Sequence, residues 1–251
     1  MANRLSASRL QPSVSTILKT FAAFFVLNVG TFLMVQLVVT YSSFDDQAGF
    51  LKEKQAYIHL PVWKTAFYVH VFTSILALMA GFTQFSARIL AHHRWLHRLF
   101  GRVYAIVILL INFPAGLVMA VCANGGTTSR AAFLILDLLW FGFTLKAVLE
   151  ARRGRISEHR DYMLRSYALT LSALTLRTWK IILTNTTDLP PETIYMIDAW
   201  LGFVPNWLCA EWIIASRRRS ASTSKKHPED RHHSNKESDE ADDKTQNASC
   251  P

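Results

Sequence analysis

Six long apolar segments occur between Leu18 and Ala215, and short polar connections separate them. A helix needs about 20 mainly apolar residues to cross roughly 30 Å of hydrocarbon, and each segment is long enough. The pattern therefore predicts an all-α fold, a polytopic bundle of six membrane-spanning helices. The expected spans are Leu18–Tyr41, Thr65–Ser86, Phe100–Ala123, Ala131–Glu150, Met163–Thr184 and Thr193–Ala215.

Glycine and proline inside several segments, such as Gly81 and Pro205, also favour a membrane location. These residues weaken helices in water but are common in lipid-embedded helices. The alternative is a soluble protein whose helices are apolar all round. It is disfavoured because the segments make up most of the chain up to Ala215.

Lysine and arginine residues gather on alternate connections, which predicts the orientation of the bundle. Positively charged connections stay in the cytoplasm, so both termini are expected there, in agreement with an even number of spans. The net charge of +9 follows from this topology and implies no nucleic-acid partner. The residues concerned are Arg4, Arg9, Lys19, Arg88, Arg94, Arg98, Arg102, Arg152, Arg153, Arg155, Arg160, Arg165, Arg217, Arg218 and Arg219.

The sequence divides into three regions. A cytoplasmic N-terminal segment is expected at residues 1–17, the six-helix domain at 18–216, and a disordered cytoplasmic tail at 217–251. The tail is rich in serine, histidine and charged residues and has too little apolar surface to fold. The first span is expected to be retained, because its apolar core is longer than that of a signal peptide. Three cysteines far apart in this topology predict no disulfide framework.

Two of the expected cytoplasmic helix starts have similar sequences. The run His97–Tyr104 reads His-Arg-Leu-Phe-Gly-Arg-Val-Tyr, and His159–Tyr167 reads His-Arg-Asp-Tyr-Met-Leu-Arg-Ser-Tyr. The matched residues lie two spans apart, as a parallel duplication of a helix pair would place them. The alternative is that cytoplasmic helix starts generally collect arginine and tyrosine at the headgroup level.

Several motifs between Tyr68 and Ile214 occur in an order that resembles a bacterial family of predicted membrane proteins, domain of unknown function 2306. The motifs are His70, the run His97–Tyr104, Trp140, the run His159–Leu169, Arg177 and the run Pro205–Trp212. The resemblance implies a polytopic helical protein, which we expect as a multi-pass protein of the bacterial inner (plasma) membrane. It implies no established activity.

Ionisable residues within the spans are candidates for function, because charges inside a bilayer are costly. At about 1.5 Å of rise per residue, His70, Asp137 and Arg177 lie at a similar depth on the outer side. We expect a buried ion pair between Asp137 and Arg177, with His70 close by. On the inner side, Glu211 is placed to pair with an arginine from a neighbouring helix end.

Two histidines of the inner side suggest a redox function. His97 and His159 could ligate one b-type haem, by analogy with membrane haem proteins of the cytochrome b561 kind, because neutral imidazole suits iron. The haem propionates would then meet Arg98, Arg102 and Arg165. An outer haem would need His70 together with His59. If the chain is an enzyme, this reading predicts a membrane oxidoreductase with a redox partner.

Two other readings of the inner histidines stay open. His93 and His97 could share a helix face and bind a divalent metal. Alternatively, the histidines belong to a basic loop that contacts anionic lipid headgroups.

The second functional class is a non-redox protein: an accessory or structural subunit, or a small transporter, alone or as a homo-oligomer in the lipid bilayer. Buried Asp137, Arg177 and Asp198 would then line a polar path or hold helices together. Pro114 is the one proline expected in mid-membrane, so the paired broken helices of many carriers are not expected. The core is expected from the second to sixth spans, with the first span peripheral. Walker, HExxH and GxSxG motifs are absent.

Overall fold

A computed structural model describes the backbone of residues 14–220 and the side chains of residues 28–86 and 89–220. All regular elements in this part are helices, which confirms the predicted all-α class. The N-terminal segment up to residue 13 and the tail from residue 221 lie outside the described residues. Residues 217–220, expected in the tail, continue a helix instead.

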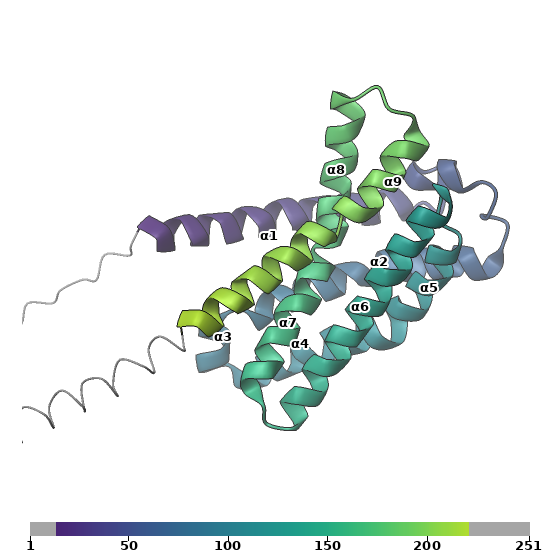
Figure 1. Cartoon of the computed structure of the whole chain (residues 1–251). Helices are drawn as coiled ribbons and strands as arrows, with labels where there is room; N and C mark the ends of the chain where they lie inside the picture. Colours follow the sequence, from purple (N-terminus) through teal and green to yellow (C-terminus); the bar gives the residue numbers. More distant parts are fainter. Residues whose placement is uncertain (1–13, 221–251) are drawn as a thin grey trace, which may run out of the picture.

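The helices follow one another with short connections (Figure 1). In chain order they are α1 (Val14–Tyr41), the 3-10 helix η1 (Gly49–Lys54), α2 (Pro61–Gln84), α3 (Ala87–His92), α4 (Arg94–Ile106), the π-helix η2 (Val107–Asn112), α5 (Phe113–Val121), α6 (Gly126–Arg152), α7 (Ile156–Thr170), α8 (Ser172–Thr186), α9 (Pro191–Leu201) and a C-terminal helix over residues 204–220.

Three helical segments of the described part are long and apolar enough to cross a membrane. They are α2, the continuous segment Arg94–Val121 formed by α4, η2 and α5, and α6, and they match the second, third and fourth predicted spans. The described part of α1, Asn28–Tyr41, is apolar but shorter. Large apolar side chains such as Leu76, Leu110 and Leu138 are exposed along these helices, as a surrounding of lipid requires.

The proline in the third predicted span does not break its helix. Pro114 has no N–H, and its ring conflicts with the carbonyl group of the residue four positions earlier. The chain resolves this conflict by forming the π-helix η2 directly before α5, because a wider turn accommodates the missing hydrogen bond. The segment stays continuous as a result.

The fifth and sixth predicted spans are each interrupted, which the sequence analysis did not expect. In the sixth, α9 ends at Leu201, and the next helix starts at residue 204. Pro205 explains why α9 ends at Leu201. In a continuous helix the proline ring would clash with the carbonyl group of Leu201, four residues earlier. In the fifth, Leu171 separates α7 from α8. There, Ser172 Oγ donates to the carbonyl oxygen of Leu169, and hydroxyl groups bound in this way bend helices.

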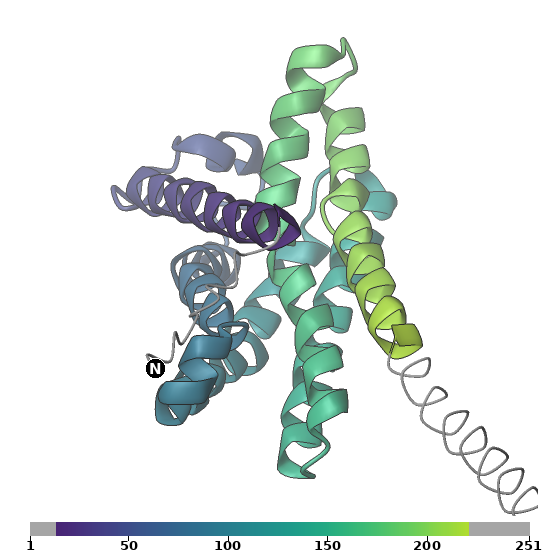
Figure 2. The ribbon, with the colours of Figure 1, turned by 90° about the vertical axis from the view of Figure 1, so that its left-hand side faces the viewer.

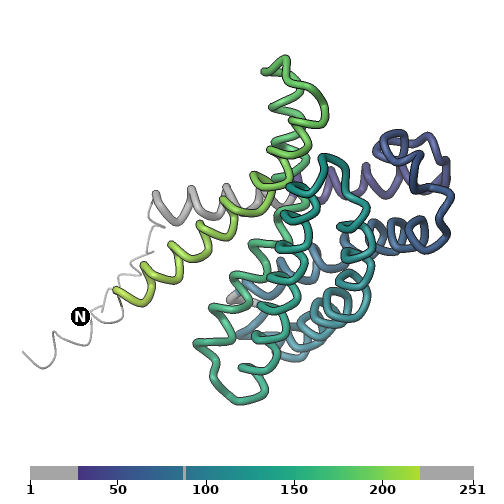
Figure 3. The backbone as a smooth tube through the Cα atoms, turned by 45° about the vertical axis from the view of Figure 1, so that its right-hand side comes forward, coloured from purple at the N-terminus to yellow at the C-terminus, as the bar shows by residue number. Residues whose placement is uncertain are grey.

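The helices form two neighbouring hairpins and a protruding third one (Figure 2). Helix α2 packs on α4 and α5, α6 packs on α5 and α7, and α8 packs on α9. In Figure 3 the α8–α9 hairpin extends away from the other helices. The apolar core lies between the first two hairpins, around fully buried Tyr104 and Ile108.

The first helix is not peripheral, contrary to the expectation. Helix α1 crosses the bundle near the interruption between α7 and α8 (Figures 1 and 2). A Cβ atom on Gly30 would lie 2.8 Å from Leu174 Cδ1, so this glycine allows the close approach. Met34 is 2% exposed and belongs to the main core cluster. The described half of α1 therefore forms part of the core.

Candidate functional site

A cavity of about 420 Å³ lies where α1, α2, α5, α6 and the α8–α9 hairpin meet. Its walls are mainly apolar, with Leu37, Phe67 and Leu169 among them. A smaller set of polar and charged side chains also lines it: Lys54, His70, Ser74, Asp137, Thr170, Ser172, Arg177, Lys180, Tyr195 and Asp198. An apolar pocket with a few polar groups is the usual form of a small-molecule site.

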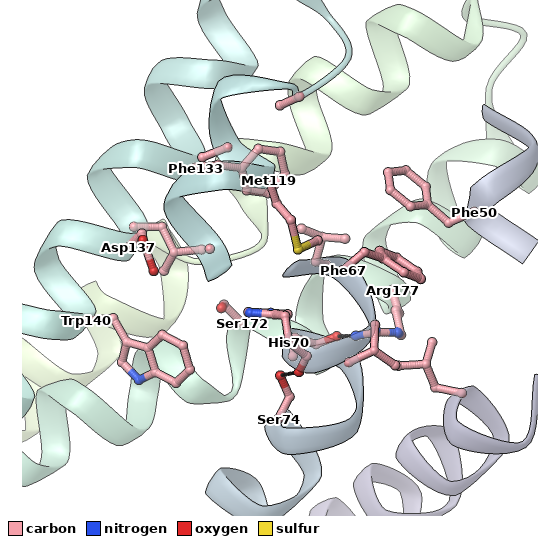
Figure 4. A pocket seen from close by; sticks show the side chains of 18 of the residues that line it. Phe50, Phe67, His70, Ser74, Met119, Phe133, Asp137, Trp140, Ser172 and Arg177 are labelled. Carbon is pink, nitrogen blue, oxygen red and sulfur yellow. Dashed lines mark hydrogen bonds between the residues drawn. The ribbon is translucent and has the colours of Figure 1, made fainter. Parts of the chain in front are cut away.

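The three outer residues singled out in the sequence all line this cavity, as Figure 4 shows. His70 comes from α2, Asp137 from α6 and Arg177 from α8. In this view His70 lies between the other two side chains. Among the described residues, Asp137 and Arg177 do not form the expected ion pair. Asp137 Oδ2 has no hydrogen-bond partner, and Arg177 donates, within the described part of the chain, only to the carbonyl oxygen of Ala173 in its own helix.

The carboxyl group of Asp137 has room because the neighbouring helix α5 carries a glycine opposite it. A Cβ atom on Gly116 of α5 would lie 2.6 Å from Asp137 Oδ1. Gly116 therefore leaves the space that the carboxyl group occupies. Asp198 of α9 lines the same cavity, is 2% exposed and also has a carboxyl oxygen without a partner.

The 3-10 helix η1 borders one end of the cavity and contributes a buried lysine. Lys54 is 2% exposed, and its Nζ donates to the carbonyl oxygen of Cys122 at 2.6 Å and to Asn124 Oδ1 at 2.8 Å. The rings of Phe50 and Tyr57 lie 5.4 and 5.5 Å from it. Burial away from water lowers the pKa of Lys54 to about 8.

A second contact joins η1 to α8 beside the cavity. Lys180 Nζ lies 3.0 Å from Glu53 Oε1. Both side chains are nearly half exposed, so this ion pair contributes little to stability. It nevertheless holds α8, which carries Arg177, against the connection that follows α1.

A closed circuit of hydrogen bonds forms the opposite end of the cavity. Trp140 Nε1 donates to Thr170 Oγ1 at 3.0 Å. Tyr104 lies 2.8 Å from both Thr170 and Ser166, Ser166 lies 2.7 Å from Thr144, and Thr144 Oγ1 donates to the carbonyl oxygen of Trp140. Because each hydroxyl has one hydrogen, the bond from Thr144 to the Trp140 carbonyl oxygen makes Ser166 the donor to Thr144 and Tyr104 the donor to Ser166. The hydrogen of Thr170 Oγ1 then has two acceptors within reach, the Tyr104 hydroxyl and the carbonyl oxygen of Ser166 at 3.1 Å.

The circuit joins α4, α6 and α7 at the Trp140 end of the cavity. Trp140 and Thr170 line the cavity, whereas Tyr104, Thr144 and Ser166 lie behind them and are completely buried. Each side chain of the circuit has a partner, which is the condition under which a buried polar network stabilises a fold.

The interruption between α7 and α8 lies against the interruption between α9 and the C-terminal helix, beside this cavity. Thr175 Oγ1 in the first turn of α8 donates to the carbonyl oxygen of Gly202. Asn206 Nδ2 of the C-terminal helix donates to Thr175 Oγ1 at 3.0 Å. A Cβ atom on Gly202 would lie only 3.0 Å from Leu176 Cβ, so glycine is needed for this approach. Paired interrupted helices are therefore present, contrary to the expectation.

At the other end of the bundle, the two candidate haem ligands lie close enough for their charges to interact. His159 Nδ1 lies 2.8 Å from the carbonyl oxygen of Ala147, and His97 Nδ1 is buried without a partner. Both side chains are half-buried, and Arg98 and Arg102 nearby are exposed. His93 precedes α4 with non-helical dihedral angles. It therefore shares no helix face with His97, and the described residues contain no group of three or more metal-ligating side chains.

Glu211 pairs with an arginine of a neighbouring helix, as expected. Arg165 of α7 donates to both carboxylate oxygens of Glu211, at 2.6 and 2.8 Å, and Trp207 Nε1 donates to Glu211 at 3.0 Å. Arg218 binds Asp161 of α7 at 2.6 Å further along. These contacts fasten the C-terminal helix to α7, away from the cavity with Asp137 and Arg177. Glu211 therefore does not belong to their cluster.

Sequence reasoning missed the part that η1 plays in the site. Lys54 lies in a polar connection between spans, where a lysine is ordinarily exposed. The signal that could have identified it is the presence of Phe50, Leu51 and Tyr57 three or four positions from Lys54, which places apolar side chains around it in a helical turn.

A comparison with known families supports the membrane assignment. A family model described as a predicted membrane protein, DUF2306, matches residues 67–214, more than half of the chain. The matched range contains the whole of α4 to α9 and three quarters of α2. No curated protein and no solved structure matches the chain significantly.

Proposed function

The chain belongs to the DUF2306 family of predicted membrane proteins, and from this premise we propose that it binds a small molecule inside its helical bundle. It would do so as a small transporter or as an accessory subunit that holds a ligand for a partner. The observation that carries this proposal is the cavity between η1 and the Trp140–Thr170 contact.

Two properties of the cavity support ligand binding. Its volume of about 420 Å³ falls within the range of pockets that enclose one small molecule. It also lies beside two interrupted helices whose interruptions contact each other through Thr175 and Gly202. Interrupted helices of this kind form substrate sites near the bilayer midplane in many transporters.

The proposed setting is the bacterial inner membrane, with several spans and both termini in the cytoplasm. The alternation of basic connections supports this orientation. It places η1 and the α8–α9 connection outside the cell and the start of α7 inside. A homo-oligomer and a redox partner both remain predictions.

Native mass spectrometry of the protein released from a neutral detergent tests the binding proposal. We expect the wild type to retain a small-molecule adduct. The Ala173→Phe variant should lose it, because a phenyl group there would fill the cavity. Ala131→Phe is the matched control, since Ala131 is exposed on α6 outside the cavity. A wild type without any adduct, or an adduct that Ala173→Phe retains, would contradict the proposal.

The second candidate function is electron transfer through a b-type haem at the inner end. The contact of His159 Nδ1 with the Ala147 carbonyl oxygen favours it. This contact fixes the ring proton on Nδ1 and leaves the Nε2 lone pair free, as in histidines that bind metals. His97 would be the second ligand, and the haem would supply one-electron transfer. Arg98 and Arg102 fit propionate partners, whereas Arg165 is already bound by Glu211.

An absorbance spectrum of the purified protein from haem-replete cells tests this candidate. A Soret band that shifts on reduction with dithionite, and that disappears in both His97→Ala and His159→Ala, is the expected result. His92→Ala serves as the control, because His92 belongs to α3 and is no proposed ligand. A flat visible spectrum would exclude haem under these conditions.

A further inference from the structure

Arg177 brings a permanent positive charge to the lining of the cavity. A guanidinium group stays protonated in proteins, whereas a carboxyl group such as that of Asp137 can take up a proton. Among the described residues, no carboxylate forms an ion pair with Arg177, and the charge of Asp198 acts on it only from beyond ion-pair distance. Leaving such a charge inside a bundle without a partner is costly.

The hydrogen-bonding capacity of Arg177 is also largely unused. One donor is directed to the carbonyl oxygen of Ala173. The other N–H groups have no partner among the described residues, although the side chain lines the cavity and is partly accessible from it. The planar fork of a guanidinium group fits the paired oxygens of a carboxylate or a phosphate.

The surroundings of Arg177 suit a ligand that is apolar apart from its head. The walls include Leu37, Phe67 and Met119. Lys54 and Lys180 add positive charge to the lining, and Lys180 is paired with Glu53 of η1. Figure 4 shows Phe67 and Met119 close to His70 and Arg177 in the same view. An inorganic anion would leave these apolar walls uncovered, whereas an amphiphile would cover them.

We propose that the cavity binds an amphiphile with an anionic headgroup, a carboxylate or a phosphate, whose head is held by Arg177. This inference rests on the proposed ligand-binding function and names the chemical class of its ligand. The apolar chain lies against the walls formed by α1, α2 and α5. Lys54, whose Nζ is bound to Cys122 and Asn124, adds positive potential at the η1 end of the cavity.

Ligands of equal chain length but different heads provide the test. The full-length protein in a maltoside detergent is titrated with hexadecanoate, hexadecyl phosphate and hexadecanol, and thermal stabilisation gives the affinities. We expect the two anions to bind about ten- to a hundredfold more tightly than the alcohol, because they gain charge-assisted hydrogen bonds. Arg177→Met should remove this preference, and Arg130→Gln, an exposed arginine outside the cavity, should keep it.

Phospholipid nanodiscs identify the source of the headgroup. Stabilisation by phosphatidylglycerol over phosphatidylcholine, lost in Arg177→Met, would support the proposal with a bilayer lipid as the ligand. Stabilisation by hexadecanoate alone would support it with a free amphiphile. Hexadecanol that binds as tightly as hexadecanoate to the wild type would overturn it, and this comparison needs no variant.

The outcome also separates the two proposals. If hexadecanol and hexadecanoate bind equally and Ala173→Phe abolishes both, the cavity binds ligands but does not select anions. If no amphiphile binds and the wild type carries no adduct, ligand binding itself is wrong. An anion preference that persists in Arg177→Met would place the headgroup elsewhere and refute the role of Arg177.

Discussion

The indole N–H of Trp140 donates to Thr170 Oγ1 at 3.0 Å, and this contact joins α6 to α7 at the edge of the cavity. It is also the first step of the hydrogen-bond circuit that returns to the carbonyl oxygen of Trp140 through Thr144. Thr170 Oγ1 is the partner of the Trp140 N–H, so removal of this hydroxyl would leave the indole N–H without an acceptor.

Replacement of Thr170 by valine should destabilise the protein. The change keeps the volume but leaves the Trp140 N–H and the Tyr104 hydroxyl with one partner fewer, at a cost of about 1–3 kcal/mol. Thermal unfolding in detergent measures the loss. Thr178→Val is the control, because Thr178 is exposed and binds only its own helix, and it should change stability by less than about 0.5 kcal/mol. Equal effects of the two replacements would show that the circuit adds no stability.

Two glycines in helices should respond in opposite directions to alanine. A Cβ atom on Gly81 would lie 2.2 Å from Tyr167 Cε2, which belongs to a buried ring. Gly81→Ala should therefore cost about 1–3 kcal/mol through overpacking. Gly142 in α6 has no neighbour within 4 Å of such an atom, so Gly142→Ala should stabilise the helix by about 0.5–1 kcal/mol. Unfolding midpoints of the two variants that move in the same direction would contradict this packing.

The sequence predicted the helices that depend on composition alone. The second, third and fourth spans and the Arg165–Glu211 pair follow from apolar length and from charges at helix ends. The interruption after Leu201 was also readable in principle, since Pro205 lies four residues beyond it. The interruption at Leu171 was not, because serine and threonine bend a helix only where their hydroxyls bind the preceding turn.

Depth in the membrane located the site but not its contacts. His70, Asp137 and Arg177 were expected at one level from the helical rise, and all three line one cavity. Whether two of them touch depends on the rotation of each helix and on the gap between helices, which spacing along a sequence does not determine. The expected Asp137–Arg177 pair failed for this reason.

Double-mutant cycles should distinguish the real ion pair from the expected one. Arg165→Met and Glu211→Gln should show a coupling energy of at least about 0.5 kcal/mol, because the two side chains share two hydrogen bonds. Arg177→Met and Asp137→Asn should give effects on stability that add. The free energies of unfolding of the four single and two double variants supply both values. Strong coupling between positions 137 and 177 would show that Asp137 and Arg177 form the ion pair that the sequence predicts.

Stability should rise with pH through the titration of Lys54, whose pKa burial lowers from 10.5 to about 8. At lower pH both the folded and the unfolded chain carry this proton, and the folded state bears the cost of the buried charge. As the pH rises from about 8 to 10.5, the folded state loses the proton first, so this residue's contribution becomes more favourable. The difference in melting temperature between the wild type and Lys54→Met, followed over this range, measures the effect.

Lys52→Met provides the matched control for this experiment, because Lys52 belongs to the same 3-10 helix but is exposed. Its difference from the wild type should not depend on pH in this range. A Lys54→Met difference that is equally flat would mean that Lys54 keeps an ordinary pKa.

Labelling of single cysteines should report the orientation in the membrane. In a variant without the native cysteines, Asp188→Cys in the α8–α9 connection should react with an impermeant thiol reagent in intact cells. Ser157→Cys at the start of α7 should react only after permeabilisation. Both positions are exposed, so accessibility is not limited by the fold. The reverse pattern would place the termini outside, and reaction of both positions in intact cells would refute a crossing between them.

The hydrogen-bond circuit that includes Trp140 and Thr170 limits the routes by which a ligand could pass through the bundle. Its hydroxyls have no spare donor to offer a visiting water molecule, and the side chains behind Trp140 are completely buried. The cavity is therefore closed at its Trp140 end, and a ligand bound in it would have to enter and leave elsewhere while the circuit is intact. Transport of a ligand past Trp140 to the other side of the bundle would require the hydrogen bonds of the circuit to break. An accessory subunit that only holds a ligand for a partner would not need to break them.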